Sequence, residues 1–219
     1  VLNWDDPQVR DFSNFTKARL LPFSRREKLN PGVCIIDDAI MINYGSNNLR
    51  VCGVDEVRIP GLHNLENALA ASAVAWAGGV TVENLAVALK NFPGVPHRLE
   101  RVEVISGVTF VNDSKGTNPD ATMNALLAVK GPKILIAGGL NKGSDFHGLV
   151  KSLRGEGVKN LILLGETAAL LETIAHDEGF DGAVIVSDLK TAVEKAFSLA
   201  LPGDTVLLSP ACASWDMFR

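Results

Sequence analysis

The second half of the chain alternates short, continuous apolar runs with segments of helical periodicity. The apolar runs are 133–138 (KILIAG), 160–165 (NLILLG), 183–187 (AVIVS) and 205–209 (TVLLS), and the amphipathic segments begin near residues 119, 146, 167 and 188. Strands that are apolar at every position are typical of a parallel sheet that is buried on both faces. The pattern predicts an α/β fold with a mostly parallel sheet covered by helices on both sides.

Local signals mark several boundaries in this half. Residues 102–111 are expected to form a hairpin around Gly107. Asn118 followed by Pro119 predicts an N-cap and a first helical position, where proline loses no hydrogen bond. Asp188 is the expected N-cap of the last helix.

The first half has a different pattern. Residues 33–45 and 47–61 predict short strands, with turn signals at Asp37-Asp38, Gly45 and Gly53. Residues 64–79 predict a helix whose six alanines favour close packing against a neighbour, and which stops at a glycine pair. Thr81 is expected to cap a second helix that runs to about Asn91.

A proline- and glycine-rich segment separates these two patterns. Pro93, Gly94 and Pro96 interrupt a helical pattern before an extended one begins. We therefore expect two domains, residues 1–94 and 95–219.

Polar residues follow three of the expected strands. They lie in residues 112–118 (NDSKGTN), 138–146 (GGLNKGSDF) and 209–214 (SPACAS). Ligands of open α/β sheets bind outside the carboxyl ends of the strands, so three such loops on one edge favour a binding cleft.

The chemistry of these loops indicates an anionic ligand. Lys115 and Lys142 supply cations, and the helix that begins at Pro119 points its positive end at the same region. Hydroxyl groups come from Thr117, Ser144, Ser209 and Ser214. Asp113 is suited to a ribose hydroxyl or a metal-bound water, although each of these residues taken alone is also compatible with a solvated charge or a turn.

Composition and charge exclude several classes of protein. The net charge of −4, with no basic stripe, argues against nucleic-acid binding. No apolar run approaches about 18 residues, so no membrane span is expected. Three cysteines in no metal spacing predict reduced thiols in a cytoplasmic protein. Cys34 and Cys52 are either partners across a hairpin or small buried side chains, and the second is favoured.

Familiar nucleotide and hydrolase motifs are absent. Lys142 precedes Gly143 where a P-loop needs lysine after its second glycine, and the chain has neither G-x-G-x-x-G after a strand nor a G-x-S-x-G elbow. Two further pairs are candidates. Asn64 and Asn67 are expected to share one face at the start of a helix, where they are either ligands or a helix cap and a surface amide. His97 lies next to Arg98, and this pair is suited to contacting a purine and a phosphate.

Five segments together resemble the Mur ligases of peptidoglycan synthesis, over essentially the whole chain. They are 61–71 (GLHNLENALAA), 92–100 (FPGVPHRLE), 111–119 (VNDSKGTNP), 138–146 (GGLNKGSDF) and 207–218 (LLSPACASWDMF). The third and fifth resemble the branch that adds D-glutamate. The first and the P-H-R of the second are shared with folylpolyglutamate synthetases.

The resemblance implies a fold and a reaction. The fold is the end of a central ATPase domain, with short strands and helices, followed by a Rossmann-like C-terminal domain that binds the amino acid. In the reaction, ATP phosphorylates the carboxylate of UDP-N-acetylmuramoyl-L-alanine, and the amine of D-glutamate attacks the acyl phosphate. The chain begins with Val1 rather than Met, and we expect it to be a piece that is inactive alone, with the P-loop and Mg²⁺ ligands upstream.

The resemblance also assigns roles to residues of this chain. It implies that D-glutamate is bound by Lys115, Thr117, Lys142 and Ser214. It implies that ATP is contacted by Asn64, Asn67, His97, Arg98 and Asp113. Lys115 is the expected catalytic residue, no metal ligand is expected in this piece, and the protein is expected to be a monomer. The alternatives are a related ligase with another acceptor and a non-enzymatic module that binds a small anion.

Overall fold

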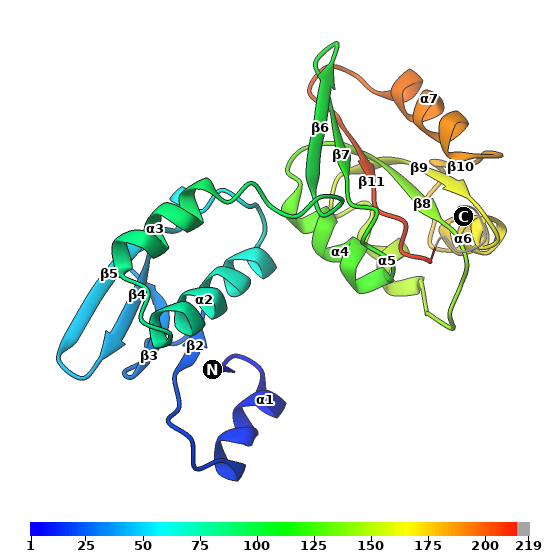
Figure 1. The fold of residues 1–219 in the computed structure, drawn as a ribbon. Helices are drawn as coiled ribbons and strands as arrows, with labels where there is room; N and C mark the ends of the chain where they lie inside the picture. The colour runs from blue at the N-terminus through cyan, green and yellow to red at the C-terminus, as the bar shows by residue number, and fades with distance from the viewer. Residues whose placement is uncertain (214–219) are drawn as a thin grey trace. The chain divides into compact units, whose positions relative to one another are not determined.

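The computed structural model describes residues 1–213, and its chain divides into two compact units (Figure 1). The units are Val1–Pro93 and Gly94–Arg219, so the division falls within the proline- and glycine-rich segment. Each unit has its own sheet and its own hydrophobic core.

The sheet of the first unit has the strand order β1-β2-β3-β4-β5 within the described residues. Its strands are β1 (Leu2–Asn3), β2 (Pro22–Ser24), β3 (Gly32–Ile36), β4 (Ala39–Tyr44) and β5 (Asn47–Gly53). The first three are parallel and the last three are antiparallel. The expected short strands are confirmed, and Asp37-Asp38 forms a two-residue turn with φ of 49° and 55°, the geometry that suits a tight hairpin.

Helices accompany this sheet. They are α1 (Pro7–Asp11), η1 (Phe12–Phe15), η2 (Val54–Glu56), α2 (Leu62–Ala77) and α3 (Val82–Asn91). The alanine-rich α2 packs on β2 and β3 through small buried residues such as Ala68 and Ala73, as the sequence predicted. It begins at Leu62 and has Gly61 as its N-cap, so Asn64 lies inside the helix and is not a cap.

The cysteines of this unit are small buried side chains. Cys34 and Cys52 are both free and buried, and they lie on β3 and β5, which β4 separates in the sheet. Pairing of these two cysteines across a hairpin is therefore excluded, and the favoured interpretation is confirmed.

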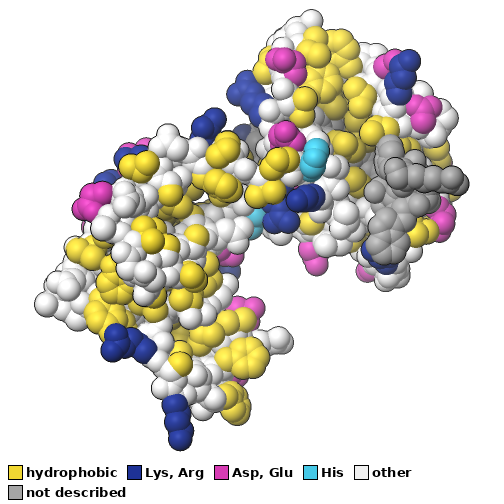
Figure 2. All heavy atoms as spheres, viewed as in Figure 1, with side chains coloured by type: hydrophobic (Ala, Val, Ile, Leu, Met, Phe, Trp, Pro, Cys, Tyr) yellow, Lys and Arg dark blue, Asp and Glu magenta, His cyan; other side chains and the backbone are white. Residues whose placement is uncertain are grey.

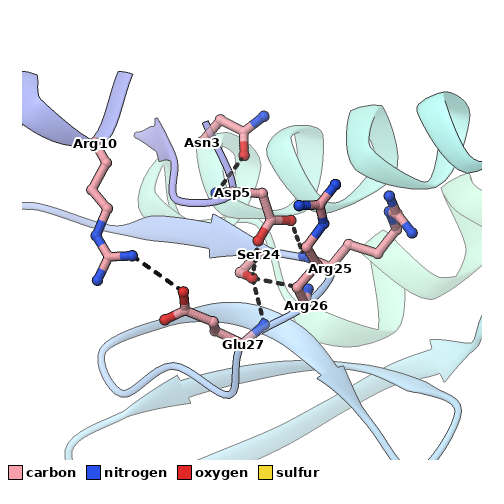
Figure 3. A network of polar contacts seen from close by, with 7 residues as sticks. All are labelled: Asn3, Asp5, Arg10, Ser24, Arg25, Arg26 and Glu27. Carbon is pink, nitrogen blue, oxygen red and sulfur yellow. Dashed lines mark hydrogen bonds and ion pairs between the residues drawn. The ribbon is translucent and has the colours of Figure 1, made fainter. Parts of the chain in front are cut away.

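A polar network joins the carboxyl ends of β1 and β2 (Figure 3). The buried Ser24 hydroxyl donates to Asp5 at 2.5 Å and accepts the backbone N–H groups of Arg26 at 3.0 Å and Glu27 at 2.7 Å. The second Asp5 oxygen accepts the Arg25 N–H at 2.7 Å. The basic segment that follows β2 is therefore anchored through its main chain, while the side chains of Arg26 and Lys28 are exposed.

The sheet of the second unit has the order β10-β9-β8-β11-β7-β6 within the described residues. Its strands are β6 (Glu100–Ile105), β7 (Val108–Asn112), β8 (Lys133–Gly138), β9 (Val158–Leu164), β10 (Ala183–Ile185) and β11 (Thr205–Leu208). All neighbours are parallel except β6 and β7, which form the expected hairpin. Hydrophobic side chains gather over this hairpin (Figure 2), where β6 exposes Val102, Val104 and Ile105.

Helices cover both faces of this sheet, as predicted (Figure 1). They are α4 (Pro119–Ala128), α5 (His147–Ser152), α6 (Ala168–Asp177) and α7 (Leu189–Leu199). Leu135 and Ala137 of β8 share a core with α4, α5 and α6, whereas Ile134 and Ile136 share one with α7. Alternate positions of one apolar strand thus enter opposite cores.

The predicted caps are present. Asn118 Oδ1 accepts the N–H of Ala121 at 2.8 Å, and Asp188 Oδ1 accepts that of Thr191 at 2.9 Å. Hydrogen bonds from Ser187 and Thr191 lower the pKa of Asp188 to about 2. No helix among residues 1–213 is long and apolar enough to cross a membrane.

The order of the strands sets where the loops lie. The chain passes from β7 through β8 and β9 to β10 with α4, α5 and α6 on one face, and then returns by α7 on the other face. The return places β11 between β8 and β7. Because these three neighbours are parallel, the loops that follow them meet at one edge.

Candidate functional site

Backbone hydrogen bonds join the three loops at this edge into one rim. The N–H of Ala211, in the loop after β11, donates to the carbonyl of Gly116 after β7 at 2.8 Å. The N–H of Gly138 at the end of β8 donates to the carbonyl of Pro210 at 2.8 Å, and Leu140 pairs with Ala213 as an isolated bridge. The loop after β11, which lies between the other two, thus fixes the loops after β7 and β8.

A buried carboxylate holds the loops after β7 and β11 together. Asp113, 5% exposed, accepts the Leu99 N–H at 3.1 Å and the Ser209 hydroxyl at 2.7 Å. The hydroxyl oxygens of Ser209 and Thr122 lie 2.9 Å apart. The contact of Asp113 with nucleotide stays a prediction, whereas its part in holding the loops together is visible.

Glycines allow the loops to approach this closely. A Cβ on Gly116 would lie 2.5 Å from both Asp113 Oδ2 and Ser209 Oγ. Gly138 and Gly139 have φ of 122° and 137°, and a Cβ on either would overlap a backbone carbonyl oxygen, of Leu164 and Ala213 respectively. A side chain would force the rim apart at Gly116 and Gly139, and would push β8 away from the end of β9 at Gly138.

Lys115 and Thr117 are exposed on the loop that leads into α4. The Lys115 N–H donates to the carbonyl of His97 at 3.1 Å, and the Thr117 N–H donates to the carbonyl of Lys115 at 2.9 Å. The α4 helix begins at Pro119, so both side chains lie just before the positive end of a ten-residue helix. This position suits the binding of an anion.

The segment before β6 folds back onto the same loop. His97 and Arg98 are exposed, and His97 has φ of 66°. Asn112 Nδ2 lies 3.0 Å from His97 Nδ1. The structure thus brings His97 beside Lys115, and it adds Asn112, whose contact with His97 the sequence did not indicate.

The loop after β8 carries Lys142, which is exposed and takes part in an interaction within the protein. Asn141 and Asp145 shape this loop. Asn141 Oδ1 accepts the Ser144 N–H at 2.8 Å, and Asp145 Oδ1 accepts the backbone N–H of His147 at 3.0 Å. Hydrogen bonds from the backbone and ring of His147 lower the pKa of Asp145. Ser214, expected to complete this part of the site, lies outside the described residues.

A fourth loop, which follows β9, supports the rim. Thr167 is 3% exposed, its N–H donates to the carbonyl of Gly139 at 3.0 Å, and its hydroxyl oxygen accepts the Gly139 N–H at 3.2 Å. The same oxygen lies 3.3 Å from the sulfur of Cys212. Sequence analysis missed Thr167 because its short loop, residues 165–167, has no cation and no motif, and only its place after a parallel strand could have indicated it.

Asn64 and Asn67 belong to the first unit. Asn64, 6% exposed, donates through Nδ2 to the carbonyl of Pro60 at 2.6 Å. Asn67 is exposed and lies with its Nδ2 3.4 Å from Asn64 Oδ1, so the two share one face of α2 as expected. Their contact with nucleotide stays a prediction.

Comparison with protein families identifies the second unit. Residues 97–212 match the family described as "Mur ligase, glutamate ligase domain". The whole chain is 49% identical to UDP-N-acetylmuramoylalanine–D-glutamate ligase of Thermoanaerobacter sp. (strain X514) and 44% identical to the ligase of that name from Clostridioides difficile (strain 630). In both cases the alignment covers 100% of this chain and 48% of the relative, so the chain spans about half the length of these curated relatives.

Solved structures support the same fold. The chain matches UDP-N-acetylmuramoylalanyl-D-glutamyl-2,6-diaminopimelate–D-alanyl-D-alanyl ligase from Acinetobacter baumannii with a TM-score of 0.70 and 18% identity, over 96% of this chain and 47% of that one. It matches MurF ligase from Thermotoga maritima, solved in complex with ADP, with a TM-score of 0.60 and 19% identity, over 94% and 48%. At such identities the likeness concerns the fold alone.

Proposed function

The chain belongs to the Mur ligase family, and from this premise we propose that its complete gene product is an ATP-dependent ligase that joins D-glutamate to UDP-N-acetylmuramoyl-L-alanine. The identity of 49% over the whole chain to a ligase named for this reaction supports the substrate assignment. We further propose that the gene product works as a monomer in the cytoplasm, where these precursors are made.

One observation carries the proposal for the acceptor. The rim presents two exposed cations, Lys115 and Lys142, on loops that a third loop ties together, beside the positive end of α4. D-Glutamate has two carboxylates and one amine that must stay neutral to react. Two separated cations can bind the two carboxylates without binding the amine, which leaves the amine available as the nucleophile.

The reaction needs charge stabilisation more than covalent help from the protein. The carboxylate of UDP-N-acetylmuramoyl-L-alanine takes the γ-phosphoryl group of ATP, and ADP leaves. The amine of D-glutamate then attacks the acyl carbon, and the C–O bond to phosphate breaks as the amine loses its proton and the amide forms. We assign to Lys115 the stabilisation of negative charge on the transferred phosphoryl group.

The remaining residues are divided between the substrates. We assign Thr117 and Ser214, together with Lys115 and Lys142, to D-glutamate. We assign Asn64, Asn67, His97, Arg98 and Asp113 to the nucleotide. Among residues 1–213 no three His, Cys, Asp or Glu side chains are grouped so as to hold a metal ion.

The direct test is phosphate release by the complete gene product. We expect release that needs ATP, UDP-N-acetylmuramoyl-L-alanine and D-glutamate together. Release with L-lysine or diaminopimelate but not with D-glutamate would refute the acceptor assignment. If no phosphate were released with any of these acceptors, a module that only binds anions would be favoured.

Two substitutions test the division of roles. We expect Lys142→Ala to raise the KM for D-glutamate more than the KM for ATP, and Arg98→Ala to do the reverse. Loss of one charge-assisted hydrogen bond corresponds to a change of about tenfold or more. Equal effects of both variants on ATP would show that the roles are divided wrongly. Lys195→Ala, in the second half of α7, is a matched control that removes a half-buried lysine away from the rim.

A further inference from the structure

The ring of His97 is held at one nitrogen and exposed at the other. Its side chain is 58% exposed, and Asn112 Nδ2 lies 3.0 Å from Nδ1. Among the described residues, Nε2 has no hydrogen-bond partner. The hydrogen bond that Asn112 makes at Nδ1 therefore decides whether Nε2 carries a proton.

The orientation of the Asn112 amide is fixed by the backbone. Its Oδ1 accepts the N–H of Ser114, two residues further on, at 3.0 Å. A backbone N–H can only donate, so the atom facing Ser114 must be the oxygen. The atom that faces His97 is consequently the amide nitrogen, which can only donate.

A donor at Asn112 requires an acceptor at His97 Nδ1. A neutral imidazole has one protonated and one unprotonated nitrogen, so its proton must then lie on Nε2. A proton on Nδ1 would place two donors face to face and break the hydrogen bond. The contact thus selects one of the two tautomers.

The backbone of His97 keeps the ring in place for this contact. The His97 N–H donates to Glu100 Oε2 at 2.8 Å, and its carbonyl accepts the N–H of Lys115 at 3.1 Å. These two hydrogen bonds hold His97 in a left-handed backbone conformation, with φ of 66°, which residues other than glycine rarely adopt. Such strain is characteristic of positions where a side chain must be aimed.

We propose that Asn112 is a positioning residue for His97, and that it holds the Nε2–H of the ring outward as a hydrogen-bond donor to an anionic oxygen of the bound nucleotide. The nucleotide as ligand rests on the proposed function, whereas the tautomer rests on the geometry alone. A phosphate oxygen suits this donor because it can only accept, and a ring with an unprotonated Nε2 would repel it.

Glu100 is the other group close to Nδ1. Its Oε2 lies 3.6 Å away, beyond hydrogen-bond distance for a neutral ring. If Glu100 rather than Asn112 governed the ring, it would draw the proton onto Nδ1, the opposite result. The two residues therefore make opposite predictions for the same nitrogen.

Nitrogen-15 NMR of the histidine side chains separates these possibilities in the 219-residue chain. Spectra recorded above pH 8, with His97→Gln to identify the signals, should show an unprotonated Nδ1 in the native chain. In Asn112→Asp one carboxylate oxygen keeps the Ser114 contact and the other faces Nδ1, so Nδ1 should become protonated. Glu100→Gln, the matched control, should leave Nδ1 unprotonated. An Asn112→Asp chain with unprotonated Nδ1 would overturn the proposal.

Calorimetric titration of the complete gene product with ATP tests the consequence for binding. His97→Gln and Asn112→Asp should each weaken ATP binding about tenfold, the effect of one hydrogen bond to a charged group, and leave D-glutamate binding within about twofold. The positioning role would be refuted if Asn112→Asp protonated Nδ1 but left ATP binding unchanged, while His97→Gln still weakened ATP binding. The ligase assignment would then still stand. Unchanged binding in both variants would instead remove His97 from the nucleotide site.

Discussion

Gly116→Ala is the smallest change that should pull the loops of the rim apart. The added Cβ would lie 2.5 Å from Asp113 Oδ2, 2.5 Å from Ser209 Oγ and 3.1 Å from the carbonyl oxygen of Asp113. Neither oxygen partner can swing into solvent, because Asp113 is 5% exposed and Ser209 is fully buried. The hydrogen bond of 2.7 Å that joins them must lengthen or break.

The expected loss of stability follows from these contacts. A hydrogen bond to a charged group contributes about 1.5–3 kcal/mol, and a side chain pushed off its rotamer costs about 0.5–1.5 kcal/mol. Replacing glycine by alanine also restricts the unfolded chain, which stabilises the fold by about 0.4–1 kcal/mol. The net expectation is a loss of about 1–4 kcal/mol from the second unit.

The two units must be measured separately, because a chain with two compact units need not unfold in one step. Hydrogen exchange at increasing urea, read by mass spectrometry of peptides, gives a free energy of opening for each unit. Peptides from β8 report on the second unit and peptides from β4 on the first. We expect the loss in β8 alone.

Gly148→Ala is the matched control, since a Cβ there meets nothing within 4 Å and the residue lies in α5. It should leave the second unit unchanged or stabilise it by up to about 1 kcal/mol. If Gly116→Ala behaved in the same way, the close packing of the loops would be wrong. Ser209→Ala in the Gly116→Ala background should couple with it, because it removes one of the two oxygens that clash.

Three further outcomes are expected. Thr167→Val removes the acceptor for the Gly139 N–H and should destabilise the second unit by about 1 kcal/mol and raise the KM for D-glutamate, with Thr167→Ser restoring both. Asp188 has a pKa lowered to about 2, so its stabilisation of α7 is present above about pH 4 and is lost as the pH falls toward 2. The hydrogen-exchange protection of α7 should therefore fall between these pH values. In Asp188→Asn the protection should not depend on pH in this range. Lys133 donates to the carbonyls of Gly131 at 2.9 Å and Glu156 at 2.5 Å. Lys133→Met should therefore cost the second unit about 1–3 kcal/mol, measured by hydrogen exchange of β8 peptides at increasing urea, and a smaller loss would show that water replaces the amine.

Local chemistry explains why much of the fold could be predicted. The cap at Asn118 depends on residues within three positions of it, and the apolar runs of β8 and β9 show their burial directly in sequence. The parallel order then follows from right-handed connections through helices, which places the polar loops on one edge. The start of α2 was missed because its cap, Gly61, carries no side chain to recognise.

The contacts that assemble the rim could not be predicted, because their partners are distant in sequence. Ser209 and Asp113 are 96 residues apart, and Thr167 and Cys212 are 45 apart. Serine and threonine in a loop are compatible with any turn, and nothing local says which acceptor each will meet. Asn112 was hidden for another reason. Its partner His97 lies 15 residues away, before β6, whereas Asn112 ends β7, and the left-handed conformation of His97 has no local sequence signal.

The loop after β11 sets the spacing of the two cations although, as far as it is described, it carries none. Its Ala211 binds the loop of Lys115 and its Pro210 and Ala213 bind the loop of Lys142, all through the main chain. A change in the course of this backbone would therefore alter the distance between the lysines while leaving both charges in place. If the two lysines bind the acceptor as proposed, selectivity between dicarboxylates of different length depends on that distance. It follows that substitutions in residues 209–213 should change which acceptor is used more than how tightly an anion is bound.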